Sequence, residues 1–211
     1  MPPSLAGSVE LTFDDGPDLL WTPAVLAALS GSSLRATFFV IAPRAAAHPQ
    51  LVAAICAAGH AVELHCYEHV RHTELDRSAV EDDTRRALAT LAGLGVRPSR
   101  WRTPYGVHAP WTREIAAAHD LKLCGWDVDT HDWRGDGAEQ MLAAVGPDLH
   151  EGAVVLLHDG LGPWAIRQGC EETVRFTRLI AAEAVAGALC HSRPISHEQG
   201  IARDGSDGGN A

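Results

Sequence analysis

Short apolar runs alternate with helix-like segments along most of this 211-residue chain. The clearest runs are Val9–Phe13, Ala36–Ile41, Ala61–Leu64 and Ala153–Leu157. Ala36–Ile41 is rich in β-branched and aromatic residues and almost without polar ones, which is typical of a strand buried on both faces. Strands that alternate with helices pair in parallel. The pattern therefore predicts an α/β fold with about seven parallel strands, in a sheet that is either open or closed into a barrel.

Six segments between or after these runs carry helix signals, and two weaker strands complete the pattern. The expected helices span residues 24–30, 51–58, 78–94, 112–119, 138–145 and 173–189, and the weaker strands are Trp101–Arg102 and 121–126. Thr22 before Pro23, Ser78 in a Ser78-x-x-Glu81 capping box, and Thr112 are the expected N-cap residues.

The composition indicates one globular domain. With 46% hydrophobic and 21% charged residues, the chain is long enough for one full core, and we expect a single domain over residues 1–199. Residues 200–211 are rich in Gly and Asp, lack periodicity, and are expected to form a disordered tail. No signal peptide and no run of membrane-spanning length is visible, which favours a cytoplasmic location.

The net charge limits the class of binding partner, and the cysteine pattern indicates the redox state of the thiols. A formal net charge of -10 argues against nucleic acid or an anionic membrane as the main partner, because both require a basic face. A small neutral or cationic substrate fits better, and the oligomeric state stays open. The five cysteines include no Cys-x-x-Cys pair, and Cys56, Cys124 and Cys190 have apolar neighbours, so we expect reduced thiols in the core.

Chemically capable residues follow the predicted strands at one end only. They are Asp14, Asp15, His65, Arg102, Asp129, Asp132 and His158. In a β/α barrel the carboxyl ends of the strands meet at one mouth, where active sites lie. We therefore expect these side chains to converge.

Asp14 and Asp15 stand at the end of the first strand, before the breaker Gly16-Pro17. A solvated acidic turn is the ordinary interpretation of such a sequence. Adjacent side chains on a strand point in different directions, however. One carboxylate could then bind a metal ion while the other stays free to accept a proton, as metal-assisted hydrolysis requires.

His65 and His69 are four residues apart, so a helical turn would place both imidazoles on one face, close enough to hold one metal ion. A carboxylate from the first strand would complete a set of three protein ligands. Three ligands leave positions open for water and substrate, which is typical of catalytic sites, whereas structural zinc sites have four. His72 is expected to be a solvated loop residue, not a fourth ligand.

Five ordered motifs resemble those of the polysaccharide deacetylases, also called the NodB homology domain or carbohydrate esterase family 4. They are Thr12–Pro17, His65-x-x-x-His69, Arg102–Tyr105, Asp129-x-x-Asp132-Trp133 and Leu156-x-His158. The resemblance covers Thr12 to His158 and implies a distorted, incomplete β/α barrel. It also implies a metal-dependent amidohydrolase that removes an N-acyl group, most commonly acetyl, from an amino sugar or a similar small amide.

The resemblance assigns the metal and the base. Asp15, His65 and His69 would bind a divalent metal, with zinc as first choice and cobalt or nickel as alternatives. Asp14 would be the general base, and Arg102 would orient it and hold it in the ionised form.

The same resemblance assigns the remaining site residues. The backbone N–H of Tyr105 would stabilise the oxyanion, and His158 would be the general acid, with Asp132 beside it favouring the imidazolium. Leu156 would line the pocket for the acyl methyl group, and Trp133 and Trp164 would form walls of the substrate cleft.

Cys66 departs from the family pattern, which usually has Ser or Thr after the first motif histidine. A thiol is a weaker hydrogen-bond donor than a hydroxyl, so the loop would be held differently. The alternative is that the Cys66 thiolate is itself a metal ligand.

Several functions remain open from the sequence. The absence of an export signal favours a soluble intracellular substrate, such as an acetylated sugar intermediate or a natural-product precursor. The first alternative is an exported chitin or peptidoglycan deacetylase. The others are a non-catalytic carbohydrate-binding relative and a hydrolase that opens a cyclic amide ring. The complete set of Asp14, Asp15, His65, His69 and His158 speaks against the last two.

Overall fold

The computed structural model describes residues 9–163 and 165–191, with side chains as far as residue 186. Seven strands form one sheet. They are β1 (Glu10–Asp14), β2 (Ala36–Ile41), β3 (Ala61–Cys66), β4 (Arg100–Trp101), β5 (Lys122–Leu123), β6 (Val128–Asp129) and β7 (Val154–His158). Trp164 and the expected tail over residues 200–211 lie outside the described residues.

All pairings in the sheet are parallel, in the order β5-β4-β3-β2-β1-β7-β6. The sheet curls into a half-barrel, which confirms the expected incomplete barrel with seven parallel strands. β5 and β6 follow one another in the chain, yet they form the two opposite edges of the sheet. Only residues 124–127 join these edges, so a short covalent connection spans the side of the barrel where strand pairing is missing.

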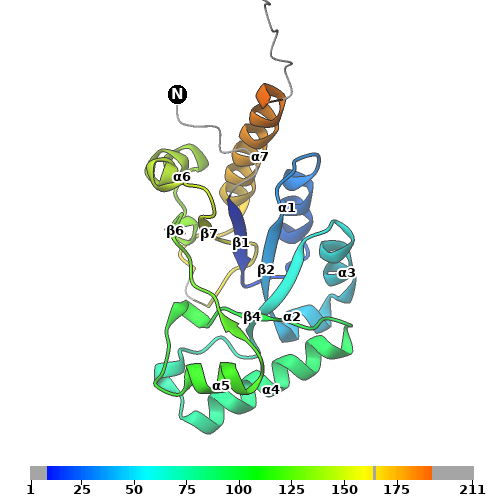
Figure 1. Cartoon of the computed structure of the whole chain (residues 1–211), viewed down its shortest axis with the longest axis vertical. Helices are drawn as coiled ribbons and strands as arrows, with labels where there is room; N and C mark the ends of the chain where they lie inside the picture. Colours follow the sequence, from blue (N-terminus) through cyan, green and yellow to red (C-terminus); the bar gives the residue numbers. More distant parts are fainter. Residues whose placement is uncertain (1–8, 164, 192–211) are drawn as a thin grey trace, which may run out of the picture.

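Helices lie around the outside of the curled sheet (Figure 1). They are α1 (Trp21–Leu29), α2 (Ala42–Ala47), α3 (Pro49–Ala57), α4 (Arg77–Gly93), α5 (Thr112–Ala118), α6 (Ala138–Val145) and α7 (Glu171–His191). Four single 3-10 turns occur in the connections: η1 (His72–Glu74), η2 (Pro104–Gly106), η3 (Asp132–Arg134) and η4 (Gly146–Asp148). Among the described helices, none combines the length and apolar character needed to cross a bilayer.

The central strands form the rigid part of the core. Every residue of β2 is buried, as its apolar sequence predicts, and the rings of Phe13 and Phe38 stack with centroids 5.1 Å apart. Each buried aromatic side chain removes a large apolar area from water, which is the dominant favourable term in folding. The strand ends that carry the polar residues are therefore held on a closely packed support.

The three predicted N-caps were wrong. The side chain that caps α4 is Asp76, which accepts a hydrogen bond from the Ala79 N–H at 2.8 Å. Asp18, not Thr22, accepts the N–H groups of Leu20 and Trp21 before α1. Asp is as good a cap as Ser or Thr, so propensity alone could not separate neighbouring candidates.

Thr22 and Thr112 instead make contacts outside a cap. The Thr22 hydroxyl donates to Asp159. Thr112 Oγ1 accepts the N–H of Ala109 at 2.9 Å and bonds to His72 Nδ1 at 2.9 Å. Both side chains are fully buried and thus join elements distant in sequence.

Three further expectations about the fold are corrected. The strand predicted over residues 121–126 is only β5, and a separate strand, β6, follows it. α2 was not predicted, because six residues are too few to show a helical period. Cys56 is exposed on α3 and Cys124 is half-buried, so neither is a core thiol, whereas the side chain of Cys190 lies outside the described part.

Candidate metal centre and active site

The carboxyl ends of the strands bring the predicted site residues to one cleft. Asp14 is the last residue of β1 and His158 the last of β7, and the register of the two strands sets them directly opposite each other. The cleft has a volume of about 370 Å³. Its lining includes Asp14, Asp15, His65, His69, Tyr105, Trp133, Leu156 and His158. Arg102 and Asp132 lie behind this lining and are buried.

Backbone conformation separates the two adjacent carboxylates. Asp15 has a φ of 71°, in the left-handed region that Asp tolerates better than most residues. Its backbone carbonyl accepts a hydrogen bond from the Arg44 guanidinium at 2.7 Å, which fixes the turn. Asp14 and Asp15 can therefore serve two different partners.

Gly16 follows because a side chain has no room there. A Cβ at this position would lie 2.3 Å from Oδ1 of the buried Asp159. Burial raises the pKa of Asp159 to about 7, against the lowering effect of the Thr22 hydroxyl, and Asp15 adds to the rise. Gly16, in the motif Thr12–Pro17, thus packs directly on the buried carboxyl group of Asp159.

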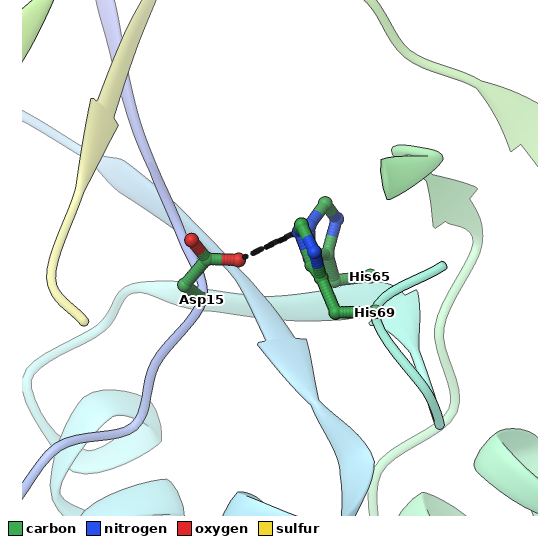
Figure 2. A group of neighbouring side chains, drawn as sticks. All are labelled: Asp15, His65 and His69. Carbon is green, nitrogen blue, oxygen red and sulfur yellow. Dashed lines mark ion pairs between the residues drawn. The ribbon is translucent and has the colours of Figure 1, made fainter. Parts of the chain in front are cut away.

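Asp15, His65 and His69 converge at one point (Figure 2). Asp15 Oδ1 lies 3.3 Å from His65 Nε2 and 3.1 Å from His69 Nε2. Two ligand atoms that each lie about 2.0 to 2.1 Å from one tetrahedral zinc ion are roughly 3.3 Å apart. The separations therefore suit a shared metal ion.

The bonding of these atoms also favours a cation. His65 Nδ1 lies 2.7 Å from the carbonyl oxygen of Arg102. Since a carbonyl can only accept, Nδ1 carries the proton, and in the neutral ring Nε2 presents a lone pair to Asp15. Asp15 Oδ1 is buried and has no hydrogen-bond partner among the described residues. Lone pairs facing one another are stable only with a positive charge between them, which is either a proton or a metal ion.

The shifted pKa values of Asp15 and His65 also indicate that these side chains favour a positive charge between them. Burial raises the pKa of Asp15, but the two imidazoles outweigh it and bring that pKa well below its usual value. Burial lowers the pKa of His65, but Asp14 and Asp15 outweigh it and raise that pKa. The donor set thus fits a divalent cation.

The histidine pair is brought together by a loop and not by a helical turn. His65 belongs to β3 and His69 to the loop that follows it. The two rings nevertheless lie with centroids 5.1 Å apart. His72 was predicted to be solvated, but it is only 3% exposed and packs on Trp101. Among the described residues, neither His72 nor Cys66 joins the three-ligand set.

Arg102 forms a direct buried ion pair with Asp14. Its Nη1 donates to Asp14 Oδ1 at 2.9 Å and to Thr12 Oγ1 at 2.7 Å. Its Nη2 donates to the carbonyl of Gly125 at 2.6 Å. One oxygen of Asp14 is therefore fixed, and the other remains available to accept a proton.

His158, which is partly exposed, and the buried Asp132 form a second pair. His158 Nδ1 lies 2.7 Å from Asp132 Oδ1, and the backbone N–H of His158 donates to Asp132 Oδ2 at 2.9 Å. Since Nδ1 donates to the carboxylate, only Nε2 can exchange a proton with a bound molecule.

Charge neighbours raise the basicity of His158. Burial by itself would lower the pKa of His158. The charge of Asp132, with smaller contributions from Asp15 and Asp14, raises this pKa to about 9. Burial raises the pKa of Asp132, but His158, Arg167 and Thr173 outweigh it and lower that pKa to about 2. The imidazolium is thus favoured at neutral pH.

Arg167 is a site residue that no sequence pattern indicated. Its Nη1 donates to Asp132 Oδ2 at 2.8 Å and its Nη2 to the His158 carbonyl at 3.0 Å. The Thr173 hydroxyl donates to the same Asp132 oxygen at 2.7 Å. Arg167 lies in an irregular segment outside the five motifs, and no periodicity or spacing in the sequence pointed to it.

Aromatic residues form walls of the cleft. Trp133 lies in the lining as predicted, and Trp126 lies there as well. Trp126 packs against Gly106, where a Cβ would approach its ring to 2.5 Å. The Tyr105 and His69 rings form a T-shaped pair with centroids 4.6 Å apart, and the Arg71 guanidinium carbon lies 3.9 Å from the centroid of the Tyr105 ring. These flat apolar surfaces suit the face of a sugar ring.

Comparison with known sequences finds one consistent family. The sequence profile described as polysaccharide deacetylase matches residues 3–124. A chitooligosaccharide deacetylase of Bradyrhizobium sp. (strain ANU 289) is 35% identical over 201 residues, which cover 90% of each chain. A peptidoglycan-N-acetylglucosamine deacetylase of Bacillus cereus is 33% identical over 157 residues, which cover 73% of this chain and 56% of that protein.

A solved structure has the same architecture. The family 4 carbohydrate esterase from Streptomyces lividans, in complex with acetate, superposes with a TM-score of 0.75 at 35% sequence identity. The alignment covers 86% of this chain and 90% of that one.

We predict that the protein binds one divalent transition metal and that His69→Ala lowers the affinity by more than about 100-fold, since it removes a ligand and not merely a supporting contact. The measurement is competition with a chelator, followed by metal analysis. His60→Ala, a change outside the cleft, is the control and should keep the wild-type affinity. Equal affinity in His69→Ala and the control would place the metal elsewhere.

We also predict that Cys66→Ser keeps the metal affinity within about a few-fold, because a hydroxyl is the better donor in the same place. Burial raises the pKa of the Cys66 thiol well above its usual value, and Asp83, Asp15 and Asp14 add to the rise. A thiolate is therefore disfavoured there. A drop in affinity of the size seen with His69→Ala would instead identify Cys66 as a ligand.

Proposed function

This chain belongs to the polysaccharide deacetylase family, carbohydrate esterase family 4, and from that membership we propose how its cleft works as a metal-dependent N-deacetylase. The substrate is an N-acetylated amino sugar in a short saccharide, and the products are acetate and a free amine. Three groups meet in one cleft and support this proposal. They are a set of three possible metal ligands, the separate carboxylate of Asp14, and His158, which the buried Asp132 holds.

Asp15, His65 and His69 would hold the metal, with zinc preferred and cobalt or nickel able to replace it. When bound, the ion polarises the acyl carbonyl and makes its water acidic. Asp14 then takes the proton of the attacking water, because one of its oxygens is held by Arg102 and the other is free for this task. Asp15 cannot do this while it is a ligand, which explains why two carboxylates are present.

His158 supplies the proton that the departing amine needs. An amine anion is a poor leaving group, so protonation must accompany the breaking of the C–N bond. Asp132 and Arg167 hold the ring through Nδ1 and the backbone, and Nε2 delivers the proton. The backbone N–H of Tyr105 adds a hydrogen bond to the developing oxyanion. Leu156, only 4% exposed, closes the space for the acetyl methyl group.

The extent of the matches favours a short chitin-type oligosaccharide as substrate. The chitooligosaccharide deacetylase of Bradyrhizobium aligns over nearly its whole length, whereas the peptidoglycan deacetylase of Bacillus cereus has about half its length outside the match. The second candidate is peptidoglycan, because that relative shares the same domain.

The test is release of acetate by metal-reconstituted protein from N-acetylglucosamine oligomers of increasing length, from peptidoglycan fragments and from small acetamides. We expect the highest kcat/KM on the oligomers. Higher kcat/KM on peptidoglycan fragments would select the second candidate. Release of no acetate from any N-acetylated saccharide, with metal bound, would refute the deacetylase assignment.

We predict that Asp14→Asn lowers kcat by about 10²- to 10⁴-fold, the usual contribution of a general base. Asn keeps an oxygen that can accept the Arg102 hydrogen bond, so the metal affinity should not change. Steady-state kinetics and chelator competition on the same preparation make the measurement. A variant that loses its metal as well would show that Asp14 acts on the metal set instead.

We predict that Asp132→Asn moves the alkaline limb of the kcat–pH profile to lower pH by about one unit or more. His158 must be protonated to act as the acid, so activity falls as the pH rises through its pKa. Removing the Asp132 charge removes the strongest influence that raises this pKa. A metal ion would offset the influence of Asp15 but not that of Asp132.

Asp136→Asn is the control for this pH profile, since Asp136 is exposed in the turn after η3. An alkaline limb that stays in place in Asp132→Asn would mean that a group other than His158 donates the proton.

A further inference from the structure

The loop between the two histidine ligands is fastened from outside the site. Residues 67–71 have no helical or strand structure. One carboxylate on α4, that of Asp83, accepts two successive N–H groups of this loop. Asp83 Oδ2 lies 2.9 Å from the N of Tyr67, and Oδ1 lies 2.6 Å from the N of Glu68. Both oxygens of one side chain thus bind the segment that carries the chain from His65 to His69.

The two histidines differ in how far they depend on this loop. His65 is fixed by the sheet, since its ring is bound by the Arg102 carbonyl and its own carbonyl accepts the Trp101 indole N–H at 2.9 Å. His69 has no such support. Its Nδ1 is buried without a hydrogen-bond partner in the described part of the chain, and its ring rests on Tyr105. The position of His69 therefore follows from the path of the loop.

Other contacts to the loop are weaker. Arg86, also on α4, lies over the Tyr67 ring at 3.9 Å and is 3.3 Å from Glu68. The Arg86 and Glu68 side chains are 40% and 64% exposed, and ion pairs at such exposure contribute little. Hydrogen bonds from backbone N–H groups to a carboxylate are among the stronger ones in proteins. Asp83 is thus the main fastening of the loop.

Asp83 also explains how the loop is held without the usual hydroxyl. Cys66 is buried at the start of the loop, and a thiol is a poor donor. The carboxylate from α4 binds the loop one and two residues further on, at Tyr67 and Glu68. In this chain, therefore, a side chain of a neighbouring helix holds the loop.

We propose that Asp83 is a positioning residue for the metal site, which keeps His69 facing Asp15 and so raises the metal affinity. This inference rests on the metal site of the proposed function. Without Asp83, two N–H groups lose their acceptor and the loop can take other paths. Metal binding then has to order His69, and the conformational entropy lost in that step lowers the metal affinity.

The experiment compares Asp83→Ala and Asp83→Asn with the wild-type full-length chain. Affinity for zinc and for cobalt is measured by chelator competition, and the visible spectrum of the cobalt form reports the ligand set. We expect Asp83→Ala to weaken binding by about 10- to 100-fold, the usual cost of losing a group that supports a metal ligand. Asp83→Asn should lie between, because it keeps one acceptor oxygen and turns an NH₂ group toward the other N–H.

Glu81→Gln is the matched control. Glu81 is an exposed carboxylate on the same helix, two residues earlier, and its change alters the net charge by the same amount as Asp83→Asn. It should bind metal as the wild type does. If Asp83→Ala fails to fold, Asp83→Asn carries the comparison, because it is nearly isosteric.

Unfolding temperatures of the metal-free and metal-loaded forms separate positioning from simple structural support. We expect the stabilisation by metal to shrink in the Asp83 variants. Equal losses in both forms, with unchanged metal affinity, would overturn the inference and leave the proposed function intact. Wild-type protein that binds no metal would overturn the proposed function itself.

Discussion

The site depends on a guanidinium that is wholly removed from water. Arg102 is 0% exposed, and its charge is balanced by Asp14 and by the hydroxyl and carbonyl groups of Thr12 and Gly125. A buried charge is tolerated only when such partners are complete. Its backbone carbonyl meanwhile fixes the ring of His65. One residue thus orients Asp14 through its side chain and His65 through its main chain, so the spacing between these two side chains is controlled at one point.

Asp132, on another side of the cleft, is also a buried charge that is tolerated because its hydrogen-bond partners are complete. Asp132 receives N–H and O–H donors from His158, Arg167 and Thr173, which offset the cost of burying its charge. These donors come from β7, from the segment before α7, and from α7 itself. The two pairs, Arg102 with Asp14 and His158 with Asp132, are therefore held by separate sets of side chains.

The sequence was sufficient to predict what strands and strand ends determine. Apolar runs located β1, β2, β3 and β7, and the residues just after them gave candidate site residues, because parallel strands in register bring their ends together. Contacts made by irregular segments were not predictable in this way. Arg167, the loop path between His65 and His69, and the burial of His72 depend on which distant element packs nearby, and periodicity carries no such information. The resemblance to a family added roles that spacing alone left open.

The shortness of the edge strands has a consequence for the behaviour of the protein at high concentration. A half-barrel, unlike a closed one, leaves two sheet edges whose N–H and C=O groups could pair with a strand of another molecule. Here the edges are β5 and β6, and each is two residues long. So short an edge offers few hydrogen bonds to an incoming strand. The two open edges of the half-barrel therefore carry little risk of edge-to-edge aggregation.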